Sequence, residues 1–183
     1  ELEIKNIESN SKKISEGSLF VAIKGFDFDG HEFVSEAIEK GAVAVMLDLT
    51  ANLKNVTIPK GITVIIAEDT RLCLAKMACN FYGHPSTKFK LIGVTGTKGK
   101  TTTTYMIKSI LEKAGHKVGL IGTIANYIGE DSLGDSSRTT PESDRLQELF
   151  ALMVKEGVEF VVMEVSSQSL KLDRVAGCDF DIG

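Results

Sequence analysis

The feature that most constrains the fold is a glycine-rich turn that ends in Gly-Lys-Thr, within GVTGTKGKTT at residues 93–102. An apolar run at residues 89–94 leads into the turn and has the length of a buried strand. Residues 103–114 follow and predict a helix, because apolar side chains recur there at helical spacing: Met106, Ile107, Ile110 and Leu111. A strand, a glycine-rich turn, Gly-Lys-Thr and a helix together form the layout of a phosphate-binding loop.

The residue types in this turn suit a phosphate group. Gly96 and Gly99 let the backbone turn tightly and approach an anion, at which the start of the following helix points its N–H groups. Lys100 can reach terminal phosphates, and the hydroxyl of Thr101 can hold Mg²⁺. The loop is a short form, because Val94 stands where the usual pattern has its first glycine. The alternative is a solvated glycine turn with incidental lysines, and the flanking strand and helix argue against it.

Composition argues against several classes of protein. The 183 residues are enough for one large or two small domains, and their net charge of −4 argues against nucleic-acid binding. Cys73, Cys79 and Cys178 have neither paired nor metal-like spacing, which indicates a reducing compartment. No apolar run is long enough to cross a membrane and no signal segment is visible, so we expect a cytoplasmic protein without a membrane partner.

The first half of the sequence alternates strand-like and helix-like segments, which predicts a small α/β domain. The expected strands are residues 18–24, 42–47 and 62–67, and the expected helices are residues 31–40 and 70–82. His84-Pro85-Ser86-Thr87 is a natural break. We therefore expect a recognition domain at residues 1–88 and a nucleotide-binding domain at residues 89–183.

The second half continues the α/β pattern after the loop. We expect strands at residues 117–123 and 158–165, and an exposed loop at residues 128–137. Thr140 and Pro141 predict a helix start, with Thr140 as the N-cap. The buried face of that helix is expected to be Leu146, Leu149, Phe150 and Met153.

Glu164 lies at the carboxyl end of the last apolar strand. In an open α/β sheet that end faces the active site, beside the loop that follows the first strand. Burying a carboxylate without a partner is costly, and Mg²⁺ favours one or two carboxylates together with hydroxyl, water and phosphate oxygens. The sequence therefore predicts that Thr101 and Glu164 hold Mg²⁺. The alternative is an ion pair between Glu164 and a basic side chain.

Several segments together resemble the Mur ligase family. Residues 96–102, GTKGKTT, resemble its ATP loop, which also lacks the outer glycine, and residues 164–167, EVSS, resemble a second segment. Residues 137–142, SRTTPE, look like the Thr-Thr-Pro substrate motif of members that add the third amino acid of the peptidoglycan stem. Residues 19–25, LFVAIKG, and residues 29–31, DGH, resemble the uridine-binding N-terminal domain, a motif shared with members that add the terminal dipeptide.

The resemblance covers nearly the whole sequence. It implies an α/β fold with a small N-terminal UDP-binding domain and a truncated, doubly wound P-loop-type central ATPase domain. It also implies a ligase, dependent on ATP and Mg²⁺, that joins an amino acid to UDP-N-acetylmuramoyl-L-Ala-D-Glu through an acyl phosphate. The family selects that amino acid in a C-terminal domain. Residues 89–183 show about three strands and the start of a fourth near Phe180, against about five or six in a doubly wound domain, so we expect an inactive fragment.

The resemblance assigns roles to individual residues. The residues that align with ATP contacts are Gly96, Thr97, Lys98, Gly99, Lys100, Thr101 and Thr102. Lys100 and Glu164 are the expected catalytic residues, and Thr101 and Glu164 the expected Mg²⁺ ligands. The residues that align with UDP contacts are Ser9, Ser11, Phe26, Asp27 and Phe28. The residues that align with contacts to the muramoyl-dipeptide are Thr139, Thr140, Ser166 and Arg174.

Other interpretations stay open. Phe26 and Phe28 could be core aromatics, and Ser9 and Ser11 could be turn formers. The whole protein could be a member that adds the terminal dipeptide, an unrelated P-loop phosphotransferase, or a non-catalytic nucleotide-binding module. The sequence leaves the oligomeric state undetermined.

Overall fold

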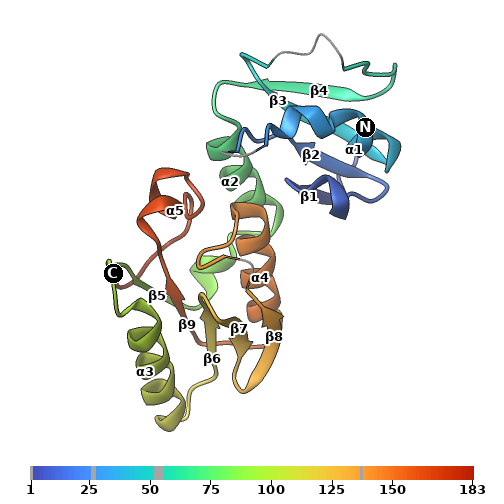
Figure 1. Ribbon diagram of the computed structural model, residues 1–183. Helices are drawn as coiled ribbons and strands as arrows, with labels where there is room; N and C mark the ends of the chain where they lie inside the picture. Colours follow the sequence, from blue (N-terminus) through green and yellow to red (C-terminus); the bar gives the residue numbers. More distant parts are fainter. Residues whose placement is uncertain (1, 26–27, 52–55, 137) are drawn as a thin grey trace. The chain divides into compact units, whose positions relative to one another are not determined.

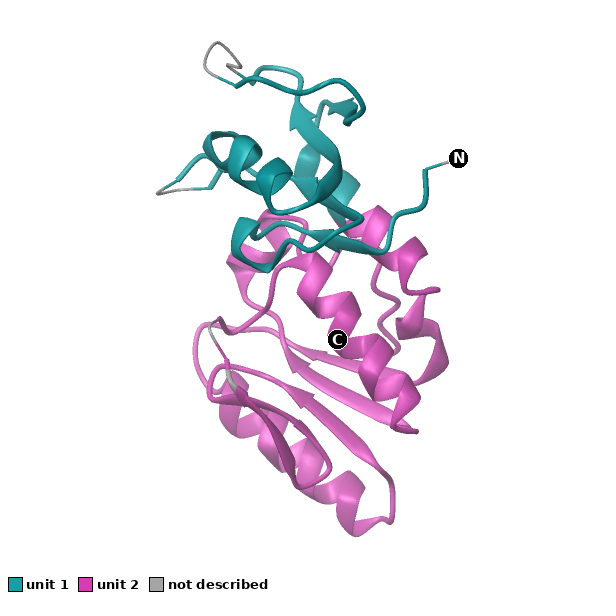
Figure 2. Cartoon of the chain, turned by 90° about the vertical axis from the view of Figure 1, so that its right-hand side faces the viewer, with its two compact units in different colours: residues 1–74 teal, residues 75–183 magenta. Residues whose placement is uncertain are grey.

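The computed structural model describes residues 2–25, 28–51, 56–136 and 138–183. They form two compact units, residues 1–74 and residues 75–183 (Figure 2). The division between the units falls inside helix α2 (Thr70–Phe81). The domain boundary near residue 88 stays a prediction.

The first unit contains a four-stranded parallel sheet, in which every strand pairs with the next one along the sequence (Figure 1). The strands are β1 (Asn6–Glu8), β2 (Ser18–Val21), β3 (Ala42–Asp48) and β4 (Thr63–Ala67). The crossover from β2 to β3 contains the 3-10 turn η2 (Gly30–Phe33) and helix α1 (Val34–Glu39). The core between α1 and the sheet includes Phe20, Val34, Ala37, Val45 and Leu47. The predicted strands and helix are present, although β2 ends at Val21 instead of residue 24 and α1 begins at Val34 instead of residue 31. β1, with one apolar residue, was not predicted.

The second unit contains a five-stranded sheet with the order β5-β9-β6-β7-β8. Its strands are β5 (Lys90–Val94), β6 (Val118–Ile121), β7 (Ala125–Ile128), β8 (Asp131–Asp135) and β9 (Phe160–Glu164). β5, β9 and β6 are parallel, and β7 and β8 continue the sheet antiparallel. On the free side of β5, Ile182 forms a parallel bridge with Ile92. This bridge is isolated, so the strand expected to begin near Phe180 stays a prediction.

Helices cover both faces of this sheet (Figure 1). Helix α3 (Lys100–Lys113) lies on one face and helix α4 (Ser143–Lys155) on the other. Alternate residues of β9 point to opposite faces, so Val161 and Met163 join the cluster under α4 and Val162 joins the cluster under α3. Burial on both faces explains why β9 is a continuous apolar run in the sequence. The predicted buried face of α4 is confirmed, at 0% to 1% exposure: Leu146, Leu149, Phe150 and Met153.

The loop expected at residues 128–137 is wrong over residues 131–135, which form β8, and residue 137 lies outside the described residues. β7 and β8 make a hairpin whose turn passes through Gly129, at a φ of 58°. β8 reads Asp-Ser-Leu-Gly-Asp and lacks β-branched and aromatic residues, so strand propensity gave no signal. Pairing with β7 stabilises it instead.

Two helix predictions also need correction. Thr140 is not the N-cap of α4, because the helix starts at Ser143 after Glu142, and the Thr140 hydroxyl bonds to β9 instead. On α3, Met106 and Ile110 are 61% and 65% exposed, and the residues that pack on the sheet are Tyr105, Ile107 and Leu111. Within the described chain, none of the helices has the length and apolar character needed to cross a membrane.

Candidate active site

The predicted phosphate-binding loop connects β5 to α3. Gly96 and Gly99 have positive φ angles of 142° and 83°. A residue with a Cβ would be strained in this backbone conformation, so glycine is required at both positions. α3 begins at Lys100, and Gly99 offers no side-chain cap to the N–H groups of its first turn. The lysine folds back over the loop, where its Nζ donates to the carbonyl of Gly96 at 2.7 Å. The loop thus presents helix N–H groups and one lysine at the same point, which suits an anion.

The Glu164 carboxylate lies at the carboxyl end of β9 and is 1% exposed. Its Oε2 accepts hydrogen bonds from the hydroxyls of Thr101 and Thr123, both at 3.1 Å, and its Oε1 accepts the Thr123 N–H at 2.9 Å. Among the described residues, no basic side chain forms an ion pair with Glu164. The carboxylate is therefore held by neutral donors, and the alternative of an ion pair has no partner in this part of the chain.

Gly122 explains how the carboxylate fits at this position. A Cβ on Gly122 would lie 2.5 Å from Oε1 of Glu164 and 3.3 Å from its Cδ. The carboxylate therefore lies directly against the backbone that follows β6. Neither Gly122 nor Thr123 was predicted as a site residue. Thr123 is a polar residue at the end of an expected strand. The same pattern identified Glu164 and would have identified Thr123 too.

The segment that contains Thr140 joins the same strand end. The Thr140 hydroxyl donates to the carbonyl of Glu164 at 2.9 Å and accepts the Ser166 N–H at 3.1 Å. Nη1 of Arg174 donates to the Thr140 carbonyl at 3.2 Å. The Thr139 hydroxyl lies 3.0 Å from that of Thr123. The structure thus brings together all residues of the second unit that were assigned to the muramoyl-dipeptide.

Charged and titratable groups surround this edge of the sheet. Arg174, 7% exposed, forms an ion pair with Glu142 at 2.9 Å, and Arg138 contacts the same carboxylate. Burial, a hydrogen bond with Tyr127 and the charge of Glu164 all raise the pKa of Tyr105. The Tyr105 phenol on α3 therefore stays protonated near neutral pH. Glu142, which holds both arginines, was not predicted as a site residue, because its buried partner Arg174 lies far from it in the sequence.

The serines assigned to UDP lie in the first unit. Ser11, 7% exposed, lies in the 3-10 turn η1 (Ser11–Lys13), and its hydroxyl donates to Oε2 of Glu36 at 3.1 Å. Nζ of Lys40 donates to the Ser11 carbonyl at 3.2 Å. Ser11 therefore ties η1 to α1. Ser9 is half-buried in the bend that follows β1.

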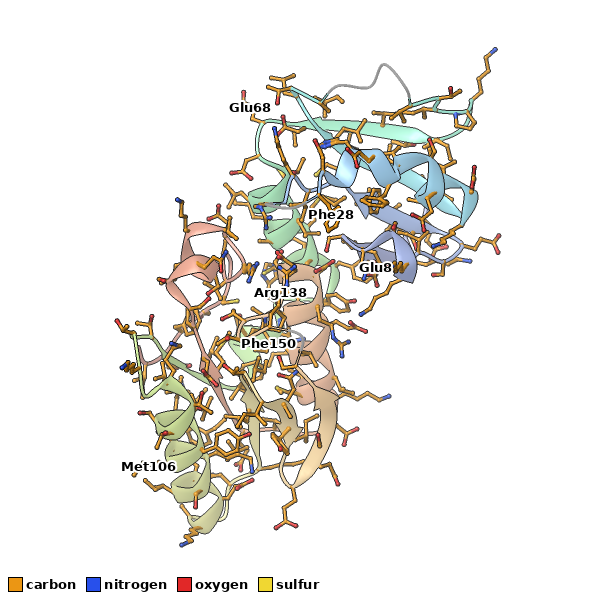
Figure 3. All side chains as sticks on the ribbon, in the orientation of Figure 1. Glu8, Phe28, Glu68, Met106, Arg138 and Phe150 are labelled. Carbon is orange, nitrogen blue, oxygen red and sulfur yellow. The ribbon has the colours of Figure 1, made fainter. Side chains whose placement is uncertain are left out.

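Of the other three residues assigned to UDP, the structure describes Phe28. Phe28, labelled in Figure 3, is 71% exposed, so it is not a core aromatic. Phe26 and Asp27 lie outside the described residues. The exposed Phe28 ring is available to stack on a planar group, whereas the contribution of its two neighbours stays a prediction.

Thr101 and Glu164 fit a hard divalent cation. Their oxygens lie 3.1 Å apart, and the carboxylate is buried without a cationic partner among the described residues. Mg²⁺ takes hydroxyl and carboxylate oxygens and keeps water and phosphate as its other ligands. Within the described residues, no three His, Cys, Asp or Glu side chains cluster as a self-contained metal site. A cation held here would therefore take its remaining ligands from phosphate and water.

Two sequence profiles match this chain. The profile described as "Mur ligase family, catalytic domain" matches residues 3–82, and the one described as "Mur ligase middle domain" matches residues 94–183. Together they span both units.

Curated relatives match over the full length of the chain. A UDP-N-acetylmuramoyl-L-alanyl-D-glutamate--2,6-diaminopimelate ligase from Clostridium perfringens is 52% identical over 183 residues, which is 100% of this chain and 37% of that protein. The enzyme of the same name from Caldanaerobacter subterraneus is 53% identical over 181 residues, 99% of this chain and 36% of that protein. The chain therefore spans about a third of the length of these relatives.

Solved structures confirm the predicted α/β fold. A UDP-N-acetylmuramoyl-L-alanyl-D-glutamate--2,6-diaminopimelate ligase matches with a TM-score of 0.79 at 24% identity, over 97% of this chain and 35% of that one. A MurF ligase from Thermotoga maritima, solved in complex with ADP, matches with a TM-score of 0.52 at 25% identity, over 91% of this chain and 33% of that one.

Proposed function

This chain belongs to the Mur ligase family, and from that premise we propose that it is part of an ATP-dependent ligase of peptidoglycan precursor synthesis. The whole enzyme attaches 2,6-diaminopimelate, as the third stem amino acid, to UDP-N-acetylmuramoyl-L-Ala-D-Glu. Relatives that carry this name are 52% and 53% identical to the chain. The proposal includes a cytoplasmic location, which the cysteine pattern supports.

One observation carries the proposal: the Thr101 hydroxyl, in the first turn after the phosphate-binding loop, lies 3.1 Å from the buried Glu164 carboxylate. The two oxygens come from segments 63 residues apart, so the fold rather than the local sequence brings them together. A glycine turn without chemistry would not need a buried carboxylate next to it. A nucleotide site needs one, because the phosphates and their cation require hard oxygen ligands at the start of the helix.

The residues of the loop have separate roles in this proposal. Residues 96–102 bind the phosphates of ATP, and Thr101 and Glu164 hold Mg²⁺, which neutralises phosphate charge when bound. Lys100 leaves the Gly96 carbonyl and turns to the terminal phosphate. Its charge then stabilises the negative charge that develops as the substrate carboxylate attacks the γ-phosphorus and ADP leaves. No side-chain nucleophile is required, since the acyl phosphate formed in this step is itself the electrophile for the incoming amine, which loses a proton as it displaces phosphate.

The remaining site residues bind the UDP-linked substrate. In the second unit, Thr139, Thr140, Ser166 and Arg174 contact the muramoyl-dipeptide. Arg174 supports this role because it is a buried guanidinium whose planar donors suit a carboxylate. In the first unit, Ser9, Ser11, Phe26, Asp27 and Phe28 contact the UDP part, and the exposed Phe28 ring supports a stacking contact with uracil.

The test uses the full-length enzyme that contains this chain. Phosphate release from ATP is measured with UDP-N-acetylmuramoyl-L-Ala-D-Glu and, in separate reactions, diaminopimelate, lysine or D-Ala-D-Ala. A further reaction combines the UDP-linked tripeptide with D-Ala-D-Ala. We expect release that requires both the UDP-linked dipeptide and diaminopimelate. Release that needs no amine would instead indicate a phosphotransferase, and D-Ala-D-Ala dependence with the tripeptide precursor would indicate the dipeptide-adding type.

A second arm uses residues 1–183 alone. We expect this piece to bind the UDP-linked dipeptide, measured by isothermal titration, and to release no phosphate above background. Steady, amine-dependent release from this piece would mean that its two units already contain the complete catalytic site.

A further inference from the structure

We propose that Thr123 is a positioning residue that connects the substrate-binding segment at Thr139 to the metal-binding carboxylate of Glu164. The inference rests on the proposed function, since it assigns substrate contact to Thr139 and metal contact to Glu164. Thr123 itself touches neither ligand in this scheme. It sets the orientation of the Glu164 carboxylate according to whether Thr139 is bound to substrate.

The geometry places the Thr123 hydroxyl between these two residues. Its Oγ lies 3.1 Å from Oε2 of Glu164 and 3.0 Å from Oγ of Thr139. The Thr123 N–H holds the other carboxylate oxygen at 2.9 Å. Thr123 thus fixes both oxygens of Glu164, and only the hydroxyl contact extends on to Thr139.

The Thr123 hydroxyl has a single proton and donates toward two acceptors, Oε2 of Glu164 and Oγ of Thr139. An ionised carboxylate can only accept, and hydrogen bonds to it are about twice as strong as neutral ones. The proton therefore favours Glu164, and Thr139 competes for it as a neutral acceptor. A substrate group that accepts the proton of Thr139 makes the Thr139 oxygen a stronger acceptor and draws the Thr123 proton away from Glu164. A substrate group that donates to Thr139 has the opposite effect and strengthens the contact between Thr123 and Glu164.

A second feature makes the carboxylate sensitive to Thr123. Gly122 leaves no space between the backbone and Glu164, since a Cβ there would lie 2.5 Å from Oε1. The carboxylate therefore cannot move toward the backbone. On its other side lies the Thr101 hydroxyl, which donates to Oε2 and is the second proposed ligand of the metal. The rotation of the carboxylate is therefore restrained by Thr101 and Thr123, and of their contacts the Thr123 hydroxyl is the one that also reaches Thr139. Partners of this kind, which orient a ligand without touching the metal, typically change metal affinity about 10- to 100-fold.

The experiment compares variants of the full-length enzyme in the binding of Mn²⁺, a paramagnetic substitute for Mg²⁺, in the presence of ADP. Free Mn²⁺ is measured by electron paramagnetic resonance, which needs no turnover. Thr123→Val removes the hydroxyl and keeps the N–H and the shape, and Thr123→Ser keeps the hydroxyl. Thr63→Val is the matched control, because Thr63 is an exposed threonine at the start of β4 with no role in the proposed site.

We expect Thr123→Val to weaken Mn²⁺ binding about 10-fold, and Thr123→Ser and Thr63→Val to bind as the parent does. A Thr123→Val enzyme with parental Mn²⁺ affinity would overturn the proposal. So would a Thr123→Ser enzyme as weak as Thr123→Val, because that result would indicate a packing role for the methyl group.

The link to Thr139 is tested by adding saturating UDP-N-acetylmuramoyl-L-Ala-D-Glu. In the parent we expect the substrate to change the affinity for Mn²⁺, and in Thr123→Val we expect that change to be lost. An identical change in both enzymes, or no change in the parent, would overturn the link. Failure of the proposed function is distinguishable from both, because it would appear as a parent enzyme that binds neither Mn²⁺ with ADP nor the UDP-linked dipeptide.

Discussion

Gly122→Ala is the substitution for which the structure predicts the most specific effect. The added methyl group would lie 2.5 Å from Oε1 of Glu164, and ordinary contact begins at 3.4 Å, so the oxygen has to retreat by about 0.9 Å. Gly122 is not among the glycines with positive φ, so alanine does not strain the backbone. The substitution therefore acts on the carboxylate and not on the chain conformation.

The size of the effect follows from what the carboxylate loses. A retreat of about 0.9 Å breaks the 2.9 Å hydrogen bond from the Thr123 N–H. A buried hydrogen bond lost in this way costs about 1–3 kcal/mol, and crowding in a packed interior costs a similar amount. Since the carboxylate also rotates away from Thr101, we expect Mg²⁺ affinity to fall about 10- to 100-fold.

Two measurements on the full-length enzyme separate these effects. Urea unfolding gives the loss of stability, and isothermal titration of Mg²⁺ in the presence of ADP gives the loss of affinity. Gly119→Ala is the matched control, because its added methyl group would lie 2.7 Å from the sulfur of buried Met153 instead of the carboxylate. We expect Gly119→Ala to destabilise the protein by a similar amount and to leave Mg²⁺ affinity unchanged.

The reasoning would be refuted by a Gly122→Ala enzyme that binds Mg²⁺ as tightly as the parent. It would also be refuted if Gly119→Ala weakened Mg²⁺ binding as much as Gly122→Ala does, because the loss would then reflect general destabilisation of the second unit. A crystal structure of Gly122→Ala would show directly whether the carboxylate has moved.

Three further predictions concern charged residues of the second unit. Lys100→Ala should lower ATP turnover by the full-length enzyme at least about 100-fold with unfolding unchanged, because it removes the charge at the phosphate end of the loop; near-normal turnover would contradict the assignment of the loop. Glu164→Gln keeps the shape of the side chain and removes its charge, so the half-saturating Mg²⁺ concentration should rise at least about 10-fold. The affinity for the UDP-linked dipeptide, measured by titration, should be unchanged. Coinciding Mg²⁺ saturation curves for the variant and the parent would mean that Glu164 is structural. The side-chain hydrogen bond from Lys90, together with the Leu91 N–H, lowers the pKa of Asp181 below its usual 3.8, so this carboxylate stabilises the fold above about pH 4 and the stabilisation is lost as pH falls through the lowered pKa. The difference in urea midpoint between the parent and Asp181→Asn should accordingly be constant at neutral pH and shrink below about pH 4, and a difference that persists undiminished at about pH 2.5 would contradict this account.

The sequence was most informative where a strand is buried on both faces. β9 has apolar residues at successive positions because both α3 and α4 cover it, so it could be recognised without knowing its partners. β8 was missed for the opposite reason. It lies at the edge of the sheet, its side chains are mostly polar, and only its pairing with β7 makes it a strand.

The misassigned cap at Thr140 shows why local patterns fail next to the candidate site. Threonine followed by proline has the local chemistry of a helix start. The hydroxyl instead donates to the carbonyl of Glu164, the last residue of β9, and accepts the N–H of Ser166. The bond to the Glu164 carbonyl is buried, and a buried polar group left without a partner costs more than the loss of a cap that solvent could replace. The competing partner lies 24 residues away, so no local rule could have identified it.

The strand order explains which parts of the candidate site the sequence revealed. β9 is the last strand in sequence but lies between β5 and β6, so the Glu164 carboxylate is flanked by the segments that follow both neighbours. The segment after β5 carries the glycine pattern and could be identified by its motif. The segment after β6 contributes Gly122 and Thr123, which show no motif in the sequence. Gly122 matters because it has no Cβ to collide with Oε1 of Glu164, and Thr123 matters because its hydroxyl donates to Oε2. If β9 paired with the other edge of β5, away from β6, Glu164 would not contact Gly122 or Thr123. The order of the strands is therefore the reason that Gly122 and Thr123 support the Glu164 carboxylate.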